Sequence, residues 1–335
     1  MPLLFNPEND LALGVGCRHY TPPPRVCSLH RAGGLMPVWW AAGGEQVVAP
    51  DATPDEVEWL RHEYGLEASI GPDGEPRPWG WSEDAARQFI QAGVSPGGLP
   101  SSQSLERMRQ LSHRRTSVEI LRMLGCGDMA GREVSALSEM DLIAGGGLFL
   151  KSPWSCSGRG VFSTRGLPAG TVASRVAGII HRQGSVMVER EFDRVRDFAA
   201  LFTSDGVKVD FVGWSVFATA AQGAYTGNLV APQDTLADRI GHEVDIQRLV
   251  DALTVIVAPH YTGPLGVDMM IYRDGGRESV HPCIELNLRM TMGFVALEVQ
   301  KRLRLDSPRL IGWEFGRMEG VPLLKPREGF ALTLR

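Results

Sequence analysis

Two carboxylates and one amide lie close together between residues 262 and 293, TGPLGVDMMIYRDGGRESVHPCIELNLRMTMG. Asp268 falls in one strand-like run, and Glu285 and Asn287 fall two apart in another, so these two share a strand face. The polar stretch RDGGRES between the runs predicts a hairpin, which brings Asp268 beside the pair. Oxygen ligands on an otherwise apolar hairpin need a compensating positive charge, and they suit Mg²⁺ with bound phosphates. The alternative is an ordinary hairpin with polar residues at its edge.

A lysine and a glycine-rich segment form a second candidate site. Lys151 ends an apolar run, and SPWSCSGRGVF follows it. Ser155, Ser157, Gly158 and Gly160 make a small-residue loop whose N–H and hydroxyl groups can hold phosphate oxygens. The loop has neither the Walker pattern nor the dinucleotide fingerprint. A plain tight turn is the alternative interpretation.

The run VMVEREF (186–192) alternates apolar positions and ends in Glu189, Arg190, Glu191 and Phe192. The backbone of such a strand end can pair with an adenine edge as another strand would, and Asp197 can accept hydrogen bonds from ribose hydroxyls. An edge strand with solvated charges is the competing interpretation.

The bulk composition limits the function classes. The chain has 335 residues, which suggests two or three lobes, and 43% hydrophobic residues, which allow a sizeable core. A net charge of −5 gives no general attraction to nucleic acid or to a membrane surface. The N-terminus lacks a signal-peptide pattern, and no apolar run reaches the roughly 18 residues of a spanning helix. We therefore expect a cytoplasmic protein with neither nucleic-acid nor membrane partners.

The cysteine pattern agrees with a reducing compartment. Five scattered cysteines argue against a disulfide framework. Cys17, His19, Cys27 and His30 are zinc-ligand types, but their spacing is unusual for a zinc site. Cytosolic thiols are the favoured interpretation.

The local patterns predict the elements that must position these residues. The first hundred residues alternate strands and helices, as in a small α/β lobe with a parallel sheet. Strands are expected there at 3–5, 37–40 and 46–48, a helix at 54–64, and a lobe boundary at 95–102. Further helices are expected at 104–124 (ended by Gly125), 173–183, 246–258 and 294–302, and strands at 148–151, 161–163, 185–189, 197–203, 207–214 and around 265–288.

The order of these features resembles the ATP-grasp superfamily, which includes D-alanine–D-alanine ligase and biotin carboxylase. The resemblance covers roughly residues 100 to 300 and is carried by FLKSPWSCSGRGVF (149–162), VMVEREF (186–192) and GVDMMI…IELNLRMTMG (266–293). It implies an α/β (α+β) protein, an ATP-grasp fold preceded by a small Rossmann-like α/β lobe. The implied division is 1–100 for that lobe, 101–205 for the small subdomain with glycine-rich lid and adenine hinge, and 206–335 for the large subdomain.

The resemblance also implies a role for each nucleotide-site residue. Lys151 would contact the α- and β-phosphates, under a lid formed by the Ser155–Gly160 loop. Arg114 stands where the family usually has a first phosphate-binding lysine, which keeps the charge and changes its shape. Glu189, Arg190, Glu191 and Phe192 would form the adenine hinge, and Asp197 matches the ribose-binding acid after a one-residue insertion.

The remaining implied roles concern metal and substrate. Asp268, Glu285 and Asn287 would hold two Mg²⁺ ions, and Arg289, on the same strand face as Asn287, would stabilise an acyl phosphate or bind the substrate carboxylate. The segment NPENDLAL follows the first strand, where α/β sheets bind ligands. Its polar residues are expected to recognise substrate, an ammonium group among the candidates, or simply to start a helix. They are Asn6, Glu8, Asn9 and Asp10.

The sequence thus predicts an ATP- and Mg²⁺-dependent ligase that joins a small carboxylate to an amine through an acyl phosphate and releases ADP and phosphate. Lys151 and Arg289 are the predicted catalytic residues. A kinase that phosphorylates a hydroxyl and a non-catalytic ATP-binding sensor are the alternatives. A homodimer is the default oligomeric expectation.

Overall fold

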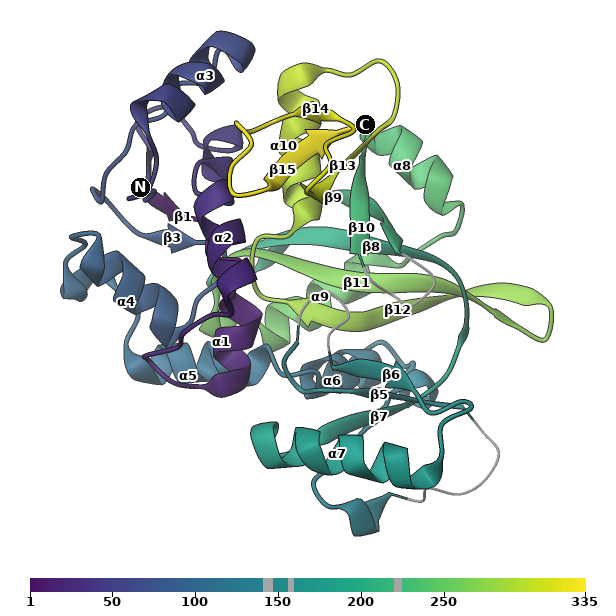
Figure 1. Cartoon of the computed structure of the whole chain (residues 1–335). Helices are drawn as coiled ribbons and strands as arrows, with labels where there is room; N and C mark the ends of the chain where they lie inside the picture. The colour runs from purple at the N-terminus through teal and green to yellow at the C-terminus, as the bar shows by residue number, and fades with distance from the viewer. Residues whose placement is uncertain (141–146, 156–159, 220–224) are drawn as a thin grey trace.

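The computed structural model describes residues 1–140, 147–155, 160–219 and 225–335 (Figure 1). The helices are α1 (Asn9–Val15), α2 (Pro24–Gly33), α3 (Pro54–Tyr64), α4 (Glu83–Gln91), α5 (Ser102–Leu111), α6 (Arg115–Met123), α7 (Ala169–Gln183), α8 (Gln233–Ile240), α9 (Ile246–Ile256) and α10 (Met292–Leu303). Short 3₁₀ helices are η1 (Met36–Trp39), η2 (Pro96–Gly98), η3 (Gly127–Met129), η4 (Leu137–Glu139) and η5 (Ala258–His260). The strands are β1 (Pro2–Leu4), β2 (Gln46–Val47), β3 (Arg77–Pro78), β4 (Arg132–Val134), β5 (Leu148–Lys151), β6 (Val161–Ser163), β7 (Val186–Arg190), β8 (Asp193–Asp205), β9 (Val209–Thr219), β10 (Tyr225–Val230), β11 (Thr262–Asp274), β12 (Arg277–Asn287), β13 (Arg309–Phe315), β14 (Val321–Pro322) and β15 (Phe330–Leu334).

The first lobe is built on a three-stranded sheet in the order β2-β1-β3, and β1 is parallel to both neighbours. This confirms the parallel sheet expected from the alternating strands and helices. Helix α3 begins at a capping box in which the Thr53 hydroxyl accepts from the Glu56 amide and the Glu56 carboxylate accepts from the Thr53 amide. The helix spans the predicted residues, 54–64.

A four-stranded antiparallel sheet in the order β4-β7-β5-β6 follows, and α7 packs on it (Figure 1). Val176 and Ile179 of α7 are buried against Leu150, Val186 and Val188 of the strands. This small core holds Lys151 at the end of β5 in place.

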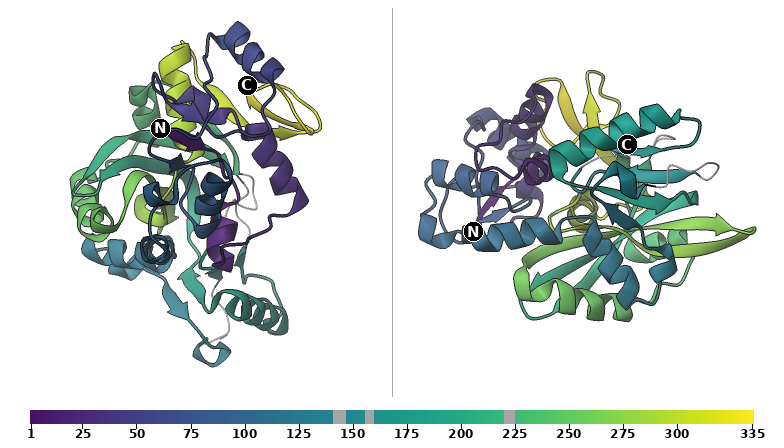
Figure 2. Two further views of the ribbon diagram at one scale, coloured as in Figure 1. Left: turned by 90° about the vertical axis from the view of Figure 1, so that its left-hand side faces the viewer. Right: turned by 90° about the horizontal axis from the view of Figure 1, so that it is seen from below.

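The third sheet has eight strands in the order β12-β11-β8-β9-β10-β13-β15-β14. Neighbouring β8 residues serve both of its faces, since Phe202 packs in a core with α6 and α9, and Leu201 packs in a core with α10. Seen from below, the helices of the first lobe gather at one end of the molecule, and the light-green β11–β12 hairpin points to the other (Figure 2). The mixture of helices and sheets confirms the α/β (α+β) class. The lobe boundaries at residues 100 and 205 stay predictions, and β8 pairs within the eight-stranded sheet.

The predicted hairpin is present. Strands β11 and β12 pair antiparallel across a two-residue turn at Gly275 and Gly276, whose φ angles are 56° and 83°. Positive φ at both positions matches the turn that fits the twist of paired strands, and glycine adopts it without steric cost. The register places Asp268 directly opposite Glu285.

Two expected elements were wrong. The segment 37–40 is not a strand but belongs mainly to η1, because Pro37 lacks the N–H that a strand would need and suits the start of a helix. The single helix expected at 104–124 is two helices, α5 and α6, interrupted between Leu111 and Arg115. The C-terminal strands β13 to β15 and helices α4 and α8 were not predicted.

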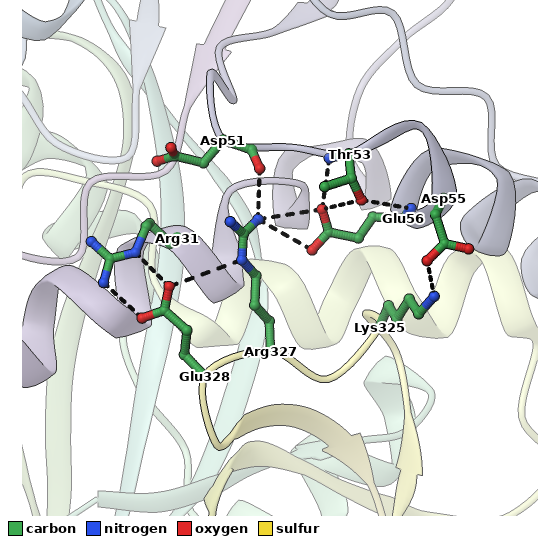
Figure 3. A network of polar contacts seen from close by, with 8 residues as sticks. All are labelled: Arg31, Asp51, Thr53, Asp55, Glu56, Lys325, Arg327 and Glu328. Carbon is green, nitrogen blue, oxygen red and sulfur yellow. Dashed lines mark hydrogen bonds and ion pairs between the residues drawn. The ribbon is translucent and has the colours of Figure 1, made fainter.

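The C-terminal segment is tied to the first lobe by side-chain ion pairs (Figure 3). Glu328 lies in a tight turn at φ 51°, a conformation that costs a non-glycine residue free energy. Its carboxylate meets Arg31 of α2 with N–O distances of 2.5 and 2.7 Å. The ion pairs are Arg31–Glu328, Arg327–Glu56 and Lys325–Asp55.

Two negative findings concern the described parts of the chain. None of the helices there has the length and apolar character that crossing a bilayer requires. Of the two histidines in the unusual cysteine–histidine group, His30 contacts both Glu8 oxygens, at 3.0 and 3.1 Å. Across the described residues, no group of three or more His, Cys, Asp or Glu is arranged to hold a metal ion.

Candidate functional site

The carboxylate pair on the β11–β12 hairpin lacks full charge compensation. Asp268 keeps some exposed surface but lies deep in the molecule, and burial, followed by the negative charge of Glu285, raises its pKa to about 7. The charge of Arg289 and a hydrogen bond with Asn287 oppose this rise only in part. A divalent cation would supply the missing positive charge, so two carboxylates and an amide oxygen fit Mg²⁺ here.

Arg114 bridges the glycine-rich segment and this hairpin. It is buried at the N-terminus of α6, and its Nη2 donates to Glu285 Oε2 at 2.7 Å. Its Nη1 donates to the Ser152 carbonyl and to Ser155 Oγ, both at 3.2 Å. The buried Nε finds no hydrogen-bond partner among the described residues. A buried guanidinium with an unused donor beside a carboxylate is suited to receive an anion such as phosphate.

Lys151 is also held by a carboxylate. Its Nζ lies 2.6 Å from Glu189 Oε2, and both side chains are largely buried. Glu189 of β7 lies opposite Phe149 of β5. Because Phe149 and Lys151 are two residues apart on β5, Glu189 is on the same face of the sheet as Lys151. The predicted phosphate-binding lysine and the first residue of the predicted hinge therefore meet.

The predicted hinge continues into an aromatic group. The Phe192 ring makes edge contacts with Tyr272 and His281, at ring-centroid distances of 4.8 and 5.0 Å. The Arg190 guanidinium carbon lies over the same ring, 4.5 Å from its centroid. Burial, then the charge of Lys151, lowers the pKa of His281 to about 4, so this ring is neutral at neutral pH. Glu191 pairs outward with Arg165 at 3.1 Å.

The other nucleotide-site predictions have mixed placements. Asp197 lies on β8 opposite Met270 and accepts from Arg194 at 3.0 Å. Gly160 has φ 69°, and its carbonyl accepts from the Ser152 amide at 2.8 Å. Ser157 and Gly158 lie outside the described residues.

The first lobe reaches the hairpin through Asp10 and Arg289. Both Asp10 oxygens accept from Arg289 Nε at 3.0 Å, and Nη2 lies 2.8 Å from Oδ2. Arg289 Nη2 also donates to Asn287 Oδ1 at 2.9 Å. A cavity surrounds this meeting point, and its lining residues are Asn9, Asp10, Leu13, Ser112, Trp154, Ser155, Glu285, Leu286, Asn287, Leu288 and Arg289.

The remaining NPEND residues have partners within the first lobe. Asn6 is buried and exchanges hydrogen bonds with Gly80, at 2.9 and 3.2 Å. Glu8 is buried and accepts from Gln88 at 2.7 Å in addition to its contact with His30. Glu8 occupies the N-cap of α1 but makes no side-chain capping bond, so helix capping does not account for it. Asn9 lines the cavity, and its amide nitrogen can donate to the Gly80 carbonyl at 2.9 Å.

Trp154 is the main cavity residue that the sequence prediction missed. Its ring packs edge-on against His113 at 4.7 Å and under the Arg109 guanidinium at 4.0 Å. The Trp154 backbone amide donates to Gln183 Oε1 at 3.1 Å, and Gln183 Nε2 donates to the Trp154 carbonyl at 3.0 Å. A tryptophan within a small-residue loop was the signal that could have identified this anchor.

The comparisons with known proteins identify the fold. No family model matches the chain, and no curated protein matches it. The solved structures that resemble it include biotin carboxylase from Campylobacter jejuni, at 12% identity and TM-score 0.54 over 99% of this chain and 86% of that one. A putative ATP-grasp superfamily protein from Archaeoglobus fulgidus matches at 12% identity and TM-score 0.52, over 99% of this chain and 98% of that one. N5-carboxyaminoimidazole synthase from Aspergillus clavatus matches at 15% identity and TM-score 0.50, over 86% of this chain and 80% of that one. The chain has the ATP-grasp fold, as the sequence motifs predicted.

Proposed function

Starting from the ATP-grasp fold, we propose that this protein is an ATP-dependent ligase that joins a carboxylate to an amine through an acyl phosphate, releasing ADP and phosphate. One observation carries the proposal. The Asp268–Glu285–Asn287 group, suited to metal and phosphate, directly adjoins a cavity that contains the arginine Arg289. A carboxylate held by that arginine would lie next to the γ-phosphate, which is the arrangement that phosphoryl transfer to an acid requires.

The proposed nucleotide site consists of Lys151 and Arg114 for the phosphates, the Ser155–Gly160 loop as lid, Glu189 to Phe192 as adenine hinge and Asp197 for the ribose. Each cation is paired with a carboxylate in the structure, Lys151 with Glu189 and Arg114 with Glu285. Phosphate oxygens would replace these carboxylates as partners of the two cations, and bound Mg²⁺ would then compensate the released Glu285.

Asp268, Glu285 and Asn287 are proposed to hold two Mg²⁺ ions. When bound, these ions would offset the charge on the β- and γ-phosphates. The chain's own residues supply the rest. Arg289 binds and orients the acid, and Lys151 stabilises charge on the phosphates. Trp154 fixes the root of the glycine-rich segment, which limits the access of water to the acyl phosphate.

The solved neighbours support this assignment by what they bind. The Aspergillus clavatus enzyme is in complex with ADP and 5-aminoimidazole ribonucleotide, and the Campylobacter jejuni biotin carboxylase with a β,γ-ATP compound. Small-molecule acid and amine substrates are accordingly proposed. A cytoplasmic location and a homodimer also remain proposals, the first resting on five scattered cysteines.

Product analysis tests the proposal against its two alternatives. The purified protein is incubated with Mg²⁺–ATP and pools of small carboxylic acids, amino acids and amines, and ADP, AMP and free phosphate are measured. If the protein is a ligase, ADP and phosphate form only when acid and amine are both present. ADP without free phosphate would indicate a kinase acting on a hydroxyl. Tight Mg²⁺–ATP binding without turnover would favour a sensor.

A further inference from the structure

The Asp10–Arg289 pair joins two lobes inside the candidate site. Asp10 comes from α1 of the first lobe and Arg289 from the segment that directly follows β12, and each side chain is 17% exposed. Backbone contacts keep this junction fixed, because the Met290 amide donates to the Trp79 carbonyl at 2.8 Å and Gly80 forms a β-bridge with Arg289. A side chain at position 80 would not fit, since its Cβ would lie 2.4 Å from the terminal amide group of the Asn9 side chain. The two opposite charges are therefore held at a set spacing.

The other charges of the cavity leave no excess of positive charge. Glu285, which also lines it, pairs with Arg114, so that pair is neutral as well. Asn9 and Asn287 contribute neutral amides, and Leu13 and Leu288 contribute apolar surface. A simple carboxylate that bound Arg289 would displace Asp10 and leave its charge uncompensated in a largely buried position, which is unfavourable.

We propose that the acid substrate is a zwitterion, with an ammonium group close to its carboxylate, as in an α-amino acid. Its carboxylate binds Arg289 and its ammonium group binds Asp10, so one ion pair is replaced by two and the charges stay balanced. Asp10 is thereby the residue that selects an amino acid over an acid without the amine. The inference rests on the proposed ligase function and names the substrate class of that site.

The geometry also determines which group of the zwitterion reacts. Arg289 donates to Asn287 of the proposed metal group, so the carboxylate on Arg289 lies on the phosphate side. A carboxylate oxygen attacks the γ-phosphorus, the new O–P bond forms, and the β–γ bridging bond breaks with its electron pair leaving on ADP. The ammonium group stays protonated on Asp10 and cannot act as the nucleophile, so the amide is formed by a second molecule.

Two measurements on wild-type protein and Asp10→Asn test this assignment. Binding is measured calorimetrically for the common L-amino acids and D-alanine, each beside its deaminated acid, with Mg²⁺ and a non-hydrolysable ATP analogue present. Hydroxylamine then replaces the unknown amine, and the hydroxamate formed from the acyl phosphate is measured with ATP. Asp55→Asn serves as the matched control, because it removes a carboxylate of the same lobe from an exposed ion pair.

The expected result is that at least one amino acid binds and that its deaminated counterpart binds roughly tenfold more weakly or worse. Asp10→Asn should abolish this preference without changing the affinity for the ATP analogue, and Asp55→Asn should retain it. Equal binding of both members of every pair, or no binding of any amino acid, would overturn the inference. Hydroxamate formed equally from deaminated acids would overturn it and leave the ligase intact, whereas selective binding without any hydroxamate would support the zwitterion site and contradict the ligase.

Discussion

At the scale of single residues, the cationic side chains of the candidate site already have carboxylate partners. Arg114, Lys151 and Arg289 each contact a carboxylate, and the donor–acceptor distances lie between 2.6 and 3.0 Å. Leaving a charged group unpaired in a site of low dielectric costs much free energy. A charged ligand group must therefore displace the carboxylate that already pairs with each cation. Ligand binding at this site is therefore expected to be linked to the breaking of ion pairs.

Arg114 gives the clearest residue-level prediction. Arg114→Ala removes a proposed phosphate donor, and the affinity for Mg²⁺–ADP, measured by calorimetry, should fall by about tenfold or more because charge-assisted hydrogen bonds are lost. Affinity for Mn²⁺ alone, followed by electron paramagnetic resonance, should rise instead, since Glu285 is released from the guanidinium. Arg115→Ala is the matched control, because Arg115 pairs with Glu133 away from the hairpin. Weaker binding of both metal and nucleotide would contradict the proposed competition at Glu285.

At the scale of elements, the sequence predicted what local patterns determine. The glycine turn and the flanking apolar runs predicted the hairpin. Folding the chain at that turn placed Asp268 beside Glu285, and the observed register pairs these two residues. The break at 112–114 was missed because helical periodicity continues across it and only tertiary contacts, such as Arg114 to the Pro153 carbonyl, reveal it. The Asp10–Arg289 pair joins residues 279 positions apart, and no local pattern could locate such a contact.

The hairpin turn permits a prediction about stability. Gly276→Ala should lower the free energy of unfolding by about 1 kcal/mol, because φ 83° is disfavoured for a residue with a Cβ. Gly98→Ala is the matched control, since a Cβ there meets open space too but the backbone is not at positive φ. Urea denaturation compares the two, and equal effects would show that the turn conformation is not the cause.

At the scale of the whole molecule, the proposed function requires that the first lobe be held against the large sheet. A shared hydrophobic core provides much of this attachment, because Phe5, Trp39 and Trp79 of the first lobe pack in one cluster with Leu201 and Phe294. Two polar regions add to it. One is the Asp10–Arg289 junction at the cavity, and the other is the set of C-terminal ion pairs that contact α2 and α3 (Figure 3). The second region is far from the proposed chemistry in sequence and contains exposed charges, which solvent screens. We expect it to influence stability more than catalysis.

The Glu328–Arg31 contact should make stability depend on pH. The hydrogen bond from Arg31 lowers the pKa of Glu328 from 4.5 to about 2. A carboxylate with a lowered pKa stabilises the fold fully above its unfolded pKa, and this contribution is lost as the pH falls from about 4.5 through about 2. Glu328→Gln should therefore unfold more easily than wild type at pH 7, and the difference should shrink towards pH 3.

Thermal unfolding at several pH values measures this effect. Glu75→Gln is the control, because Glu75 is exposed and forms no ion pair among the residues that the structure describes. A Glu328→Gln difference that stays constant from pH 7 to pH 3 would rule out the ion pair as its source.

The most direct test of the proposed ligase is the fate of the carboxylate oxygen. An acid identified by the turnover screen is labelled with oxygen-18 in its carboxylate, and the phosphate released with ADP is analysed by mass spectrometry. An acyl phosphate requires that one labelled oxygen pass from the acid to the phosphate when the amide forms. Unlabelled phosphate accompanied by full amide formation would contradict the proposed reaction.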